Sequence, residues 1–123
     1  MSQGARVVVA SLGAGIVVAL VFAAFSEPRY DGSFWRAPVH YETDLLAGVL
    51  GAIIGYRFPS YRRSAVVAGA IPMAALGLTG YFSGLPQGHP DAGWYYLLAI
   101  VLVIYGAGVI LASMHRDEET DAT

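Results

Sequence analysis

Cysteine, lysine and asparagine are all absent from this chain of 123 residues. Without cysteine, the chain has no disulfide, no thiol nucleophile and no thiolate ligand for zinc or an iron–sulfur cluster. Charged residues are also scarce, at 13% of the sequence, which is about half the share of an average soluble domain. Thiol chemistry and cysteine-ligated metal centres are therefore excluded.

Charge is missing altogether from four apolar runs, at residues 7–25, 45–56, 64–82 and 94–114. Hydrophobic residues make up 56% of the sequence, more than a chain of this length can bury behind a water-facing surface. We therefore expect lipid to surround most of the molecule. The lack of ionisable groups inside the runs argues against a proton-driven transporter, which needs such groups within the membrane.

The first, third and fourth runs are long enough to cross a membrane as helices. A helix of 19 residues covers about 28 Å, close to the roughly 30 Å of the hydrocarbon core. The second run is too short by itself and spans only if its helix covers 41–58, with Thr43 or Asp44 capping its start. A re-entrant hairpin is the alternative there. The sequence thus predicts one all-α integral membrane domain over residues 1–123, with four transmembrane helices.

The first run also allows the interpretation of a cleaved signal peptide, because Arg6 precedes it and small residues follow it. Signal peptides have apolar cores of about 7–15 residues, so we expect this longer run to be retained.

Arginine distribution predicts the orientation of the chain. With four spans, Arg29 and Arg36 fall on one side of the membrane and the other five arginines fall on the opposite side. The positive-inside rule then places both termini in the cytoplasm of a multi-pass protein of the cell membrane. The acidic tail at 116–123 is expected to be a solvated, disordered cytoplasmic end. The five cytoplasmic arginines are Arg6, Arg57, Arg62, Arg63 and Arg116.

The two halves of the chain share a pattern. Phe-Ser ends both the first and the third run, and Pro and then Trp follow each pair. The segments 45–50 and 97–102 agree at five of their six positions. Tandem duplication of a helical hairpin is one interpretation, and chance agreement in Leu/Ala/Val-rich sequence is the other.

Small residues recur at every fourth position of the expected helices, where they allow close approach of helix backbones in lipid. They include Gly15 and Ala19 on the first helix, and Ala47, Gly51 and Gly55 on the second. Two interpretations stay open: packing within the bundle, or a face of the second helix that binds a second copy of the chain. We expect a homo-oligomer or membership of a larger membrane complex.

Three further features of the sequence bear on function. Pro72 removes a hydrogen bond from the third helix and predicts a kink, which in transporters can mark a solute site.

His40, Glu42 and Asp44 alternate, so an extended segment would direct all three to one side as ligands for a divalent metal. Solvated loop polarity is the simpler interpretation, and we expect no metal and no cofactor. The segment 57–63 could bind anionic lipid headgroups, although orientation alone also explains its arginines.

The segments AGVLGAIIGYR and RRSAVVAGAIP, in a chain without lysine, resemble small four-helix haloarchaeal membrane proteins of unknown function. The resemblance implies a fold but no activity. Because no nucleophile has a base nearby at membrane depth, we expect no enzyme. We expect a non-enzymatic accessory or scaffold module with membrane lipid and no nucleic acid as partner. The alternative is a small oligomeric channel or facilitator for uncharged or weakly charged solutes.

Overall fold

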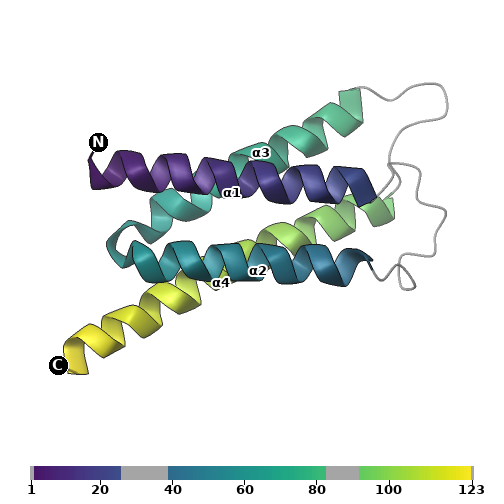
Figure 1. Cartoon of the computed structure of the whole chain (residues 1–123). Coiled ribbons are helices and arrows are strands. Elements are labelled where there is room, and N and C mark those ends of the chain that lie inside the picture. Colours follow the sequence, from purple (N-terminus) through teal and green to yellow (C-terminus); the bar gives the residue numbers. More distant parts are fainter. Residues whose placement is uncertain (1, 26–38, 83–91, 123) are drawn as a thin grey trace.

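The computed structural model describes residues 2–25, 39–82 and 92–122 of the chain. They form four α-helices and one short 3-10 helix, without any strand in these three segments (Figure 1). The expected all-α fold is therefore confirmed. The helices are α1 (Gln3–Phe25), α2 (Val39–Arg57), α3 (Arg62–Phe82) and α4 (Ala92–Ala122), with η2 (Pro59–Tyr61) between α2 and α3.

The second helix is longer than its apolar run. It holds 19 residues, and its charged ends agree with the helix dipole, because Glu42 lies in the first turn and Arg57 in the last. The helix ends before Phe58, which has φ −128° and ψ 61°, outside the helical region that the following Pro59 disfavours. The segment 39–57 is thus one continuous helix, and the re-entrant hairpin is wrong.

The fourth helix extends past its apolar run through the acidic tail to Ala122, so the disordered end expected there is wrong up to this residue. An ion pair helps to hold this end, because Arg62 Nη2 lies 2.5 Å from Asp117 Oδ2. At 31 residues, α4 is about 46 Å long, and its C-terminal end projects beyond the other helices (Figure 1).

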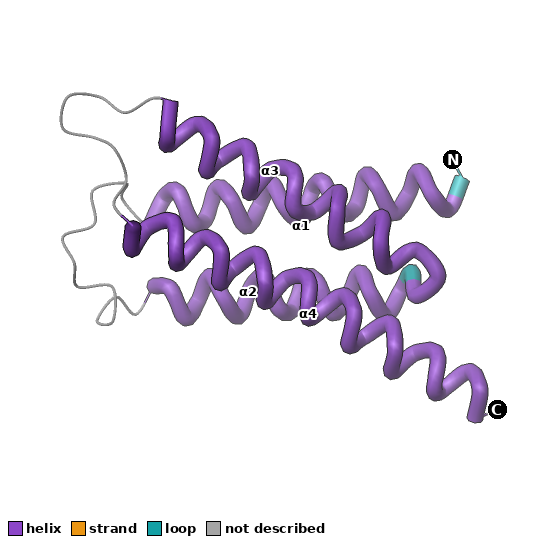
Figure 2. The backbone as a smooth tube through the Cα atoms, turned by 180° about the vertical axis from the view of Figure 1, so that it is seen from behind, coloured by secondary structure: helices purple, strands orange, loops and turns teal. Residues whose placement is uncertain are grey.

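The helices associate in two close pairs, α2 with α4 and α1 with α3. The contacts of α1 with α2 and of α3 with α4 are less close, so the order around the bundle is α1, α2, α4, α3 (Figure 2). The two helices of each close pair run in the same direction, and they come from corresponding places in the two halves of the chain. Both termini and η2 lie at one end of the bundle, which we call the arginine end because it carries all five described arginines.

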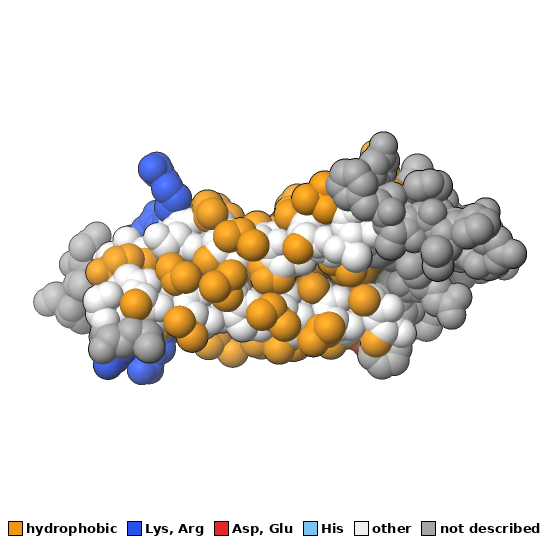
Figure 3. All heavy atoms as spheres, turned by 90° about the horizontal axis from the view of Figure 1, so that it is seen from above, with side chains coloured by type: hydrophobic (Ala, Val, Ile, Leu, Met, Phe, Trp, Pro, Cys, Tyr) orange, Lys and Arg blue, Asp and Glu red, His pale blue; other side chains and the backbone are white. Residues whose placement is uncertain are grey.

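Large apolar side chains point outward on every helix. Leu20 of α1, Leu45 of α2, Leu78 of α3 and Val103 of α4 are each at least 60% exposed. Figure 3 shows such side chains over the middle of the bundle and the described arginines at one end. Two helical segments, Gln3–Ala24 and Tyr95–Glu118, are long and apolar enough to cross a membrane. Spanning by α2 and α3, which carry charges near their ends, stays a prediction.

Candidate functional site

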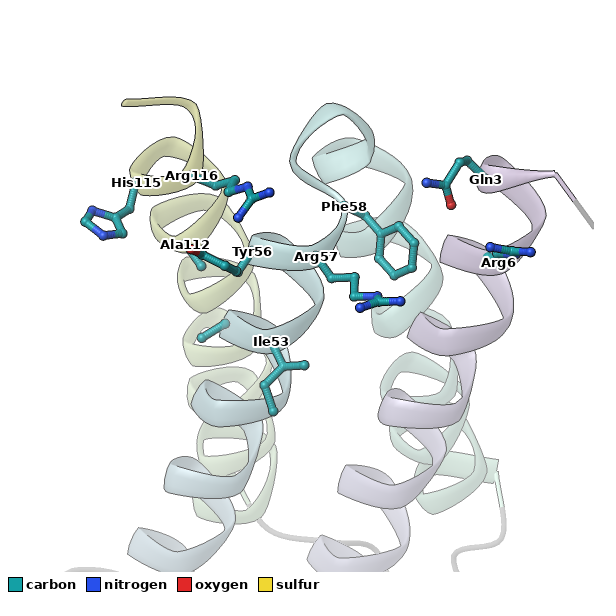
Figure 4. Close-up of a pocket in the computed structure, with 10 residues that line it drawn as sticks. Gln3, Arg6, Ile53, Tyr56, Arg57, Phe58, Ala112, His115 and Arg116 are labelled. Carbon is teal, nitrogen blue, oxygen red and sulfur yellow. The ribbon is translucent and has the colours of Figure 1, made fainter. Parts of the chain in front are cut away.

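A pocket of about 640 Å³ opens at the arginine end, between α1 on one side and α2 and α4 on the other (Figure 4). Its upper wall is basic and aromatic, and its lower wall consists of small or aliphatic side chains. The residues that line it are Gln3, Arg6, Ala52, Ile53, Tyr56, Arg57, Phe58, Ala112, His115 and Arg116.

The end of α2 places the central side chains of this pocket. Because the helix stops before Pro59, Arg57 and Phe58 lie at its mouth rather than along the bundle. Arg57 extends from α2 into the opening between the helices, with the Phe58 ring beside it, while Arg6 and Gln3 lie on α1 across that opening (Figure 4). Two arginines from different helices therefore line one cavity.

The pocket is positively charged and none of its lining residues is acidic. Arg116 lies over the Tyr56 ring, 4.8 Å from its centroid, a cation–π contact. Asp117, nearby on α4, pairs with Arg62. Among the described residues, Arg6 and Arg57 have no anionic partner. The site thus offers two uncompensated guanidinium groups to an anion.

A second polar centre lies inside the bundle. The Tyr105 hydroxyl donates a hydrogen bond to the Ala65 carbonyl oxygen at 2.7 Å, and the tyrosine is fully buried. The buried Ser11 hydroxyl of α1 lies beside it, without a hydrogen bond of ordinary geometry. Gly69 makes room for the ring, since a methyl group there would overlap it. This centre joins α1, α3 and α4.

The small residues singled out in the sequence lie inside the bundle. A methyl group on Gly51 or Gly55 would overlap the carbonyl oxygen of Tyr105 or Val109 on α4. Ala47, on the same face of α2, is fully buried. The structure therefore places this face against α4 of the same chain, where a second copy cannot reach it while α4 is bound.

The first helix contacts the third in the same way. Gly15 lies against the Gly69 carbonyl oxygen and the Pro72 ring, and Ala19 is buried one turn further along. The third helix runs from Arg62 to Phe82 without interruption at Pro72. Pro72 thus lies at a helix contact within a continuous helix, and the kink and the solute site expected there stay predictions.

Two of the suggested metal ligands, Glu42 and Asp44, do not point to the same side. Both belong to α2, and residues two apart in a helix point in different directions. The His40 side chain lies outside the described residues, whereas Glu42 is exposed and Asp44 half-buried. The described segments contain no group of three His, Cys, Asp or Glu residues that could hold a metal ion.

Tyr105 and the basic pocket were missed by sequence reasoning. A signal for Tyr105 exists, because it is a tyrosine in the middle of an apolar run, but only the fold brings it opposite Gly69. The pocket has no local signal, since its arginines come from separate helices.

Comparison with protein-family models, curated proteins and solved structures finds no match for this chain.

Proposed function

We propose that this chain is a four-span integral membrane protein that serves as a non-enzymatic accessory or scaffold module. The observation that carries the proposal is the outward-facing apolar surface of α2 and α3. On α2, Leu45, Val49 and Ile53 follow one another at every fourth position and are 69%, 47% and 57% exposed. On α3, Val67, Ile71 and Leu78 are 57%, 54% and 60% exposed.

Water is a poor solvent for such a surface. Burial of apolar area is worth about 25 cal/mol per Å², and soluble monomers rarely expose contiguous apolar patches above a few hundred Å². Lipid removes this cost on all four helices at once. The charged residues of α2 and α3 fit the same location, because they lie near the helix ends, where long arginine side chains reach the headgroup region.

The arginine end supports an orientation. All five described arginines lie there, together with both termini, and the positive-inside rule assigns such an end to the cytoplasm.

The packing of the interior supports a scaffold role. Phe22, Met73, Val101 and Tyr105 are buried at the centre of the bundle and pack together with their neighbours. The glycine faces are occupied by helices of the same chain, so association with a larger complex or with further copies would use the outward apolar surfaces.

The topology can be tested with single cysteines, since the natural chain has none. Ser60→Cys, Ser33→Cys and Gln87→Cys are labelled in sealed cells with a membrane-impermeant maleimide. Four spans predict that Ser33→Cys and Gln87→Cys react in intact cells and that Ser60→Cys reacts only after permeabilisation. If α1 and α4 alone span, all three react from outside. That result, or recovery of the chain in the soluble fraction, would overturn the topology.

The scaffold role is tested by native mass spectrometry of the protein extracted in mild detergent from its own membranes. We expect a stoichiometric membrane partner or a defined homo-oligomer. A bare monomer, released intact and without partner at every detergent concentration, would contradict a scaffold role.

A further inference from the structure

We infer that the basic pocket at the arginine end is a binding site for the phosphate-bearing headgroup of an anionic membrane lipid, with Arg6 and Arg57 as the phosphate ligands. The inference rests on the proposed membrane location and deepens it, because it assigns a specific lipid contact to one end of the bundle.

The positive charge of the pocket favours an anionic ligand. Arg6 and Arg57 line the same cavity from two helices, and none of the lining residues is acidic. The other described arginines near the pocket are engaged, Arg116 with the Tyr56 ring and Arg62 with Asp117. Arg6 and Arg57 are both exposed at this cavity, so an anion can reach them. Two like charges that line one cavity repel each other, and a bound anion replaces this repulsion with two charge-assisted hydrogen bonds. Phosphate suits this pair because the guanidinium group binds its oxygens in a bidentate manner.

The shape of the pocket points to a lipid rather than to free phosphate. Below the arginines the wall is apolar, formed by Ala52, Ile53 and Ala112. Ile53 is 57% exposed and continues the outward stripe of Val49 and Leu45 down α2. A headgroup held by the arginines would therefore place its acyl chain along this stripe. The volume of about 640 Å³ lies within the usual range for small-ligand sites.

The position of the pocket agrees with this ligand. It opens where α1 meets α2, one of the two less close helix contacts of the bundle. In the proposed orientation this end lies at the cytoplasmic leaflet, whose anionic lipids bind basic pockets between transmembrane helices. The anchored headgroup would bridge the two close helix pairs.

The inference is tested by native mass spectrometry of detergent-purified protein titrated with phosphatidylglycerol or with zwitterionic phosphatidylcholine. We expect one tightly retained phosphatidylglycerol and no comparable phosphatidylcholine. Arg6→Gln and Arg57→Gln should each weaken phosphatidylglycerol binding by about tenfold or more, as expected for loss of a hydrogen bond to a charged group. Arg63→Gln is the matched control, because Arg63 is exposed at the same end but does not line this pocket.

Three outcomes would overturn the site: equal retention of both lipids, equal loss in Arg63→Gln and Arg57→Gln, or full displacement of the lipid by millimolar inorganic phosphate, which would identify a free-phosphate site. Arg57→Lys separates charge from folding, since it should retain part of the affinity if the fold is intact. Failure of these titrations in a protein that passes the cysteine-labelling test refutes only the lipid site. Recovery of the chain in the soluble fraction refutes the membrane proposal itself.

Discussion

The Tyr105 hydroxyl of α4 donates a hydrogen bond to the Ala65 carbonyl oxygen of α3 at 2.7 Å, and this bond crosses between the two close helix pairs. Around it, Gly69 leaves space for the tyrosine ring, and Ser11 of α1 approaches the same hydroxyl. One side chain therefore connects three of the four helices at the centre of the bundle.

Tyr105→Phe should remove this hydrogen bond and keep the ring. Hydrogen bonds between membrane helices average about 0.6 kcal/mol, so we expect a loss of stability of roughly that size. Tyr105→Ala should cost several times more, about 3–5 kcal/mol by analogy with large-to-small changes in protein cores. Thermal unfolding in detergent, followed by circular dichroism, measures both. Equal losses in the two variants would show that the ring does not fill the interface.

Gly51→Ala and Gly55→Ala should destabilise the folded monomer. The new methyl group overlaps a carbonyl oxygen of α4, and the helices must separate to admit it. We expect a cost of about 1–3 kcal/mol, as for overpacking in other cores.

Gly13→Ala is the control for these two variants, because nothing lies within 4 Å of the added methyl group. The gain in helix propensity should leave its unfolding temperature unchanged or higher. If the Gly51 and Gly55 variants instead fold normally as monomers but no longer form oligomers, the face would belong to an interface between copies.

The Arg62–Asp117 pair should contribute little to global stability. The two side chains are 40% and 49% exposed, and surface ion pairs are typically worth about 0–1 kcal/mol. Asp117→Asn should therefore change the unfolding temperature slightly while it increases amide hydrogen exchange in the last turns of α4. High salt should remove the difference from the natural chain. A large, salt-independent loss would contradict this assignment.

The helices could be predicted from the sequence, but not all of their bounds. Runs of apolar residues located α1 and α3 well, because both runs, at 7–25 and 64–82, lie within the observed helices and end where these helices end. The start of α2 was harder, since His40, Glu42 and Asp44 look like a loop in an apolar chain. The end of α4 differs from the prediction, because a run of acidic residues is typical of a solvated tail whereas the helix continues to Ala122.

The partner of each helix and the position of the basic pocket could not be predicted from the sequence. A small-residue face predicts close contact but does not identify its partner, so the sequence allowed Gly51 and Gly55 to contact either another helix of the same bundle or a second copy. The pocket combines Arg6, Arg57 and Arg116, which only the arrangement of the helices brings together. The sequence predicts that Arg6 lies on the same side as the arginines between 57 and 63, but it does not show that Arg6 and Arg57 line one cavity.

The order of the helices around the bundle has a consequence for synthesis. Each helix packs most closely on one that belongs to the other half of the chain, α1 on α3 and α2 on α4. The first hairpin therefore has neither of its main neighbours when it leaves the ribosome. We expect its glycine faces to stay uncovered until the second half has been synthesised, and during that interval they are accessible to chaperones and to other nascent chains.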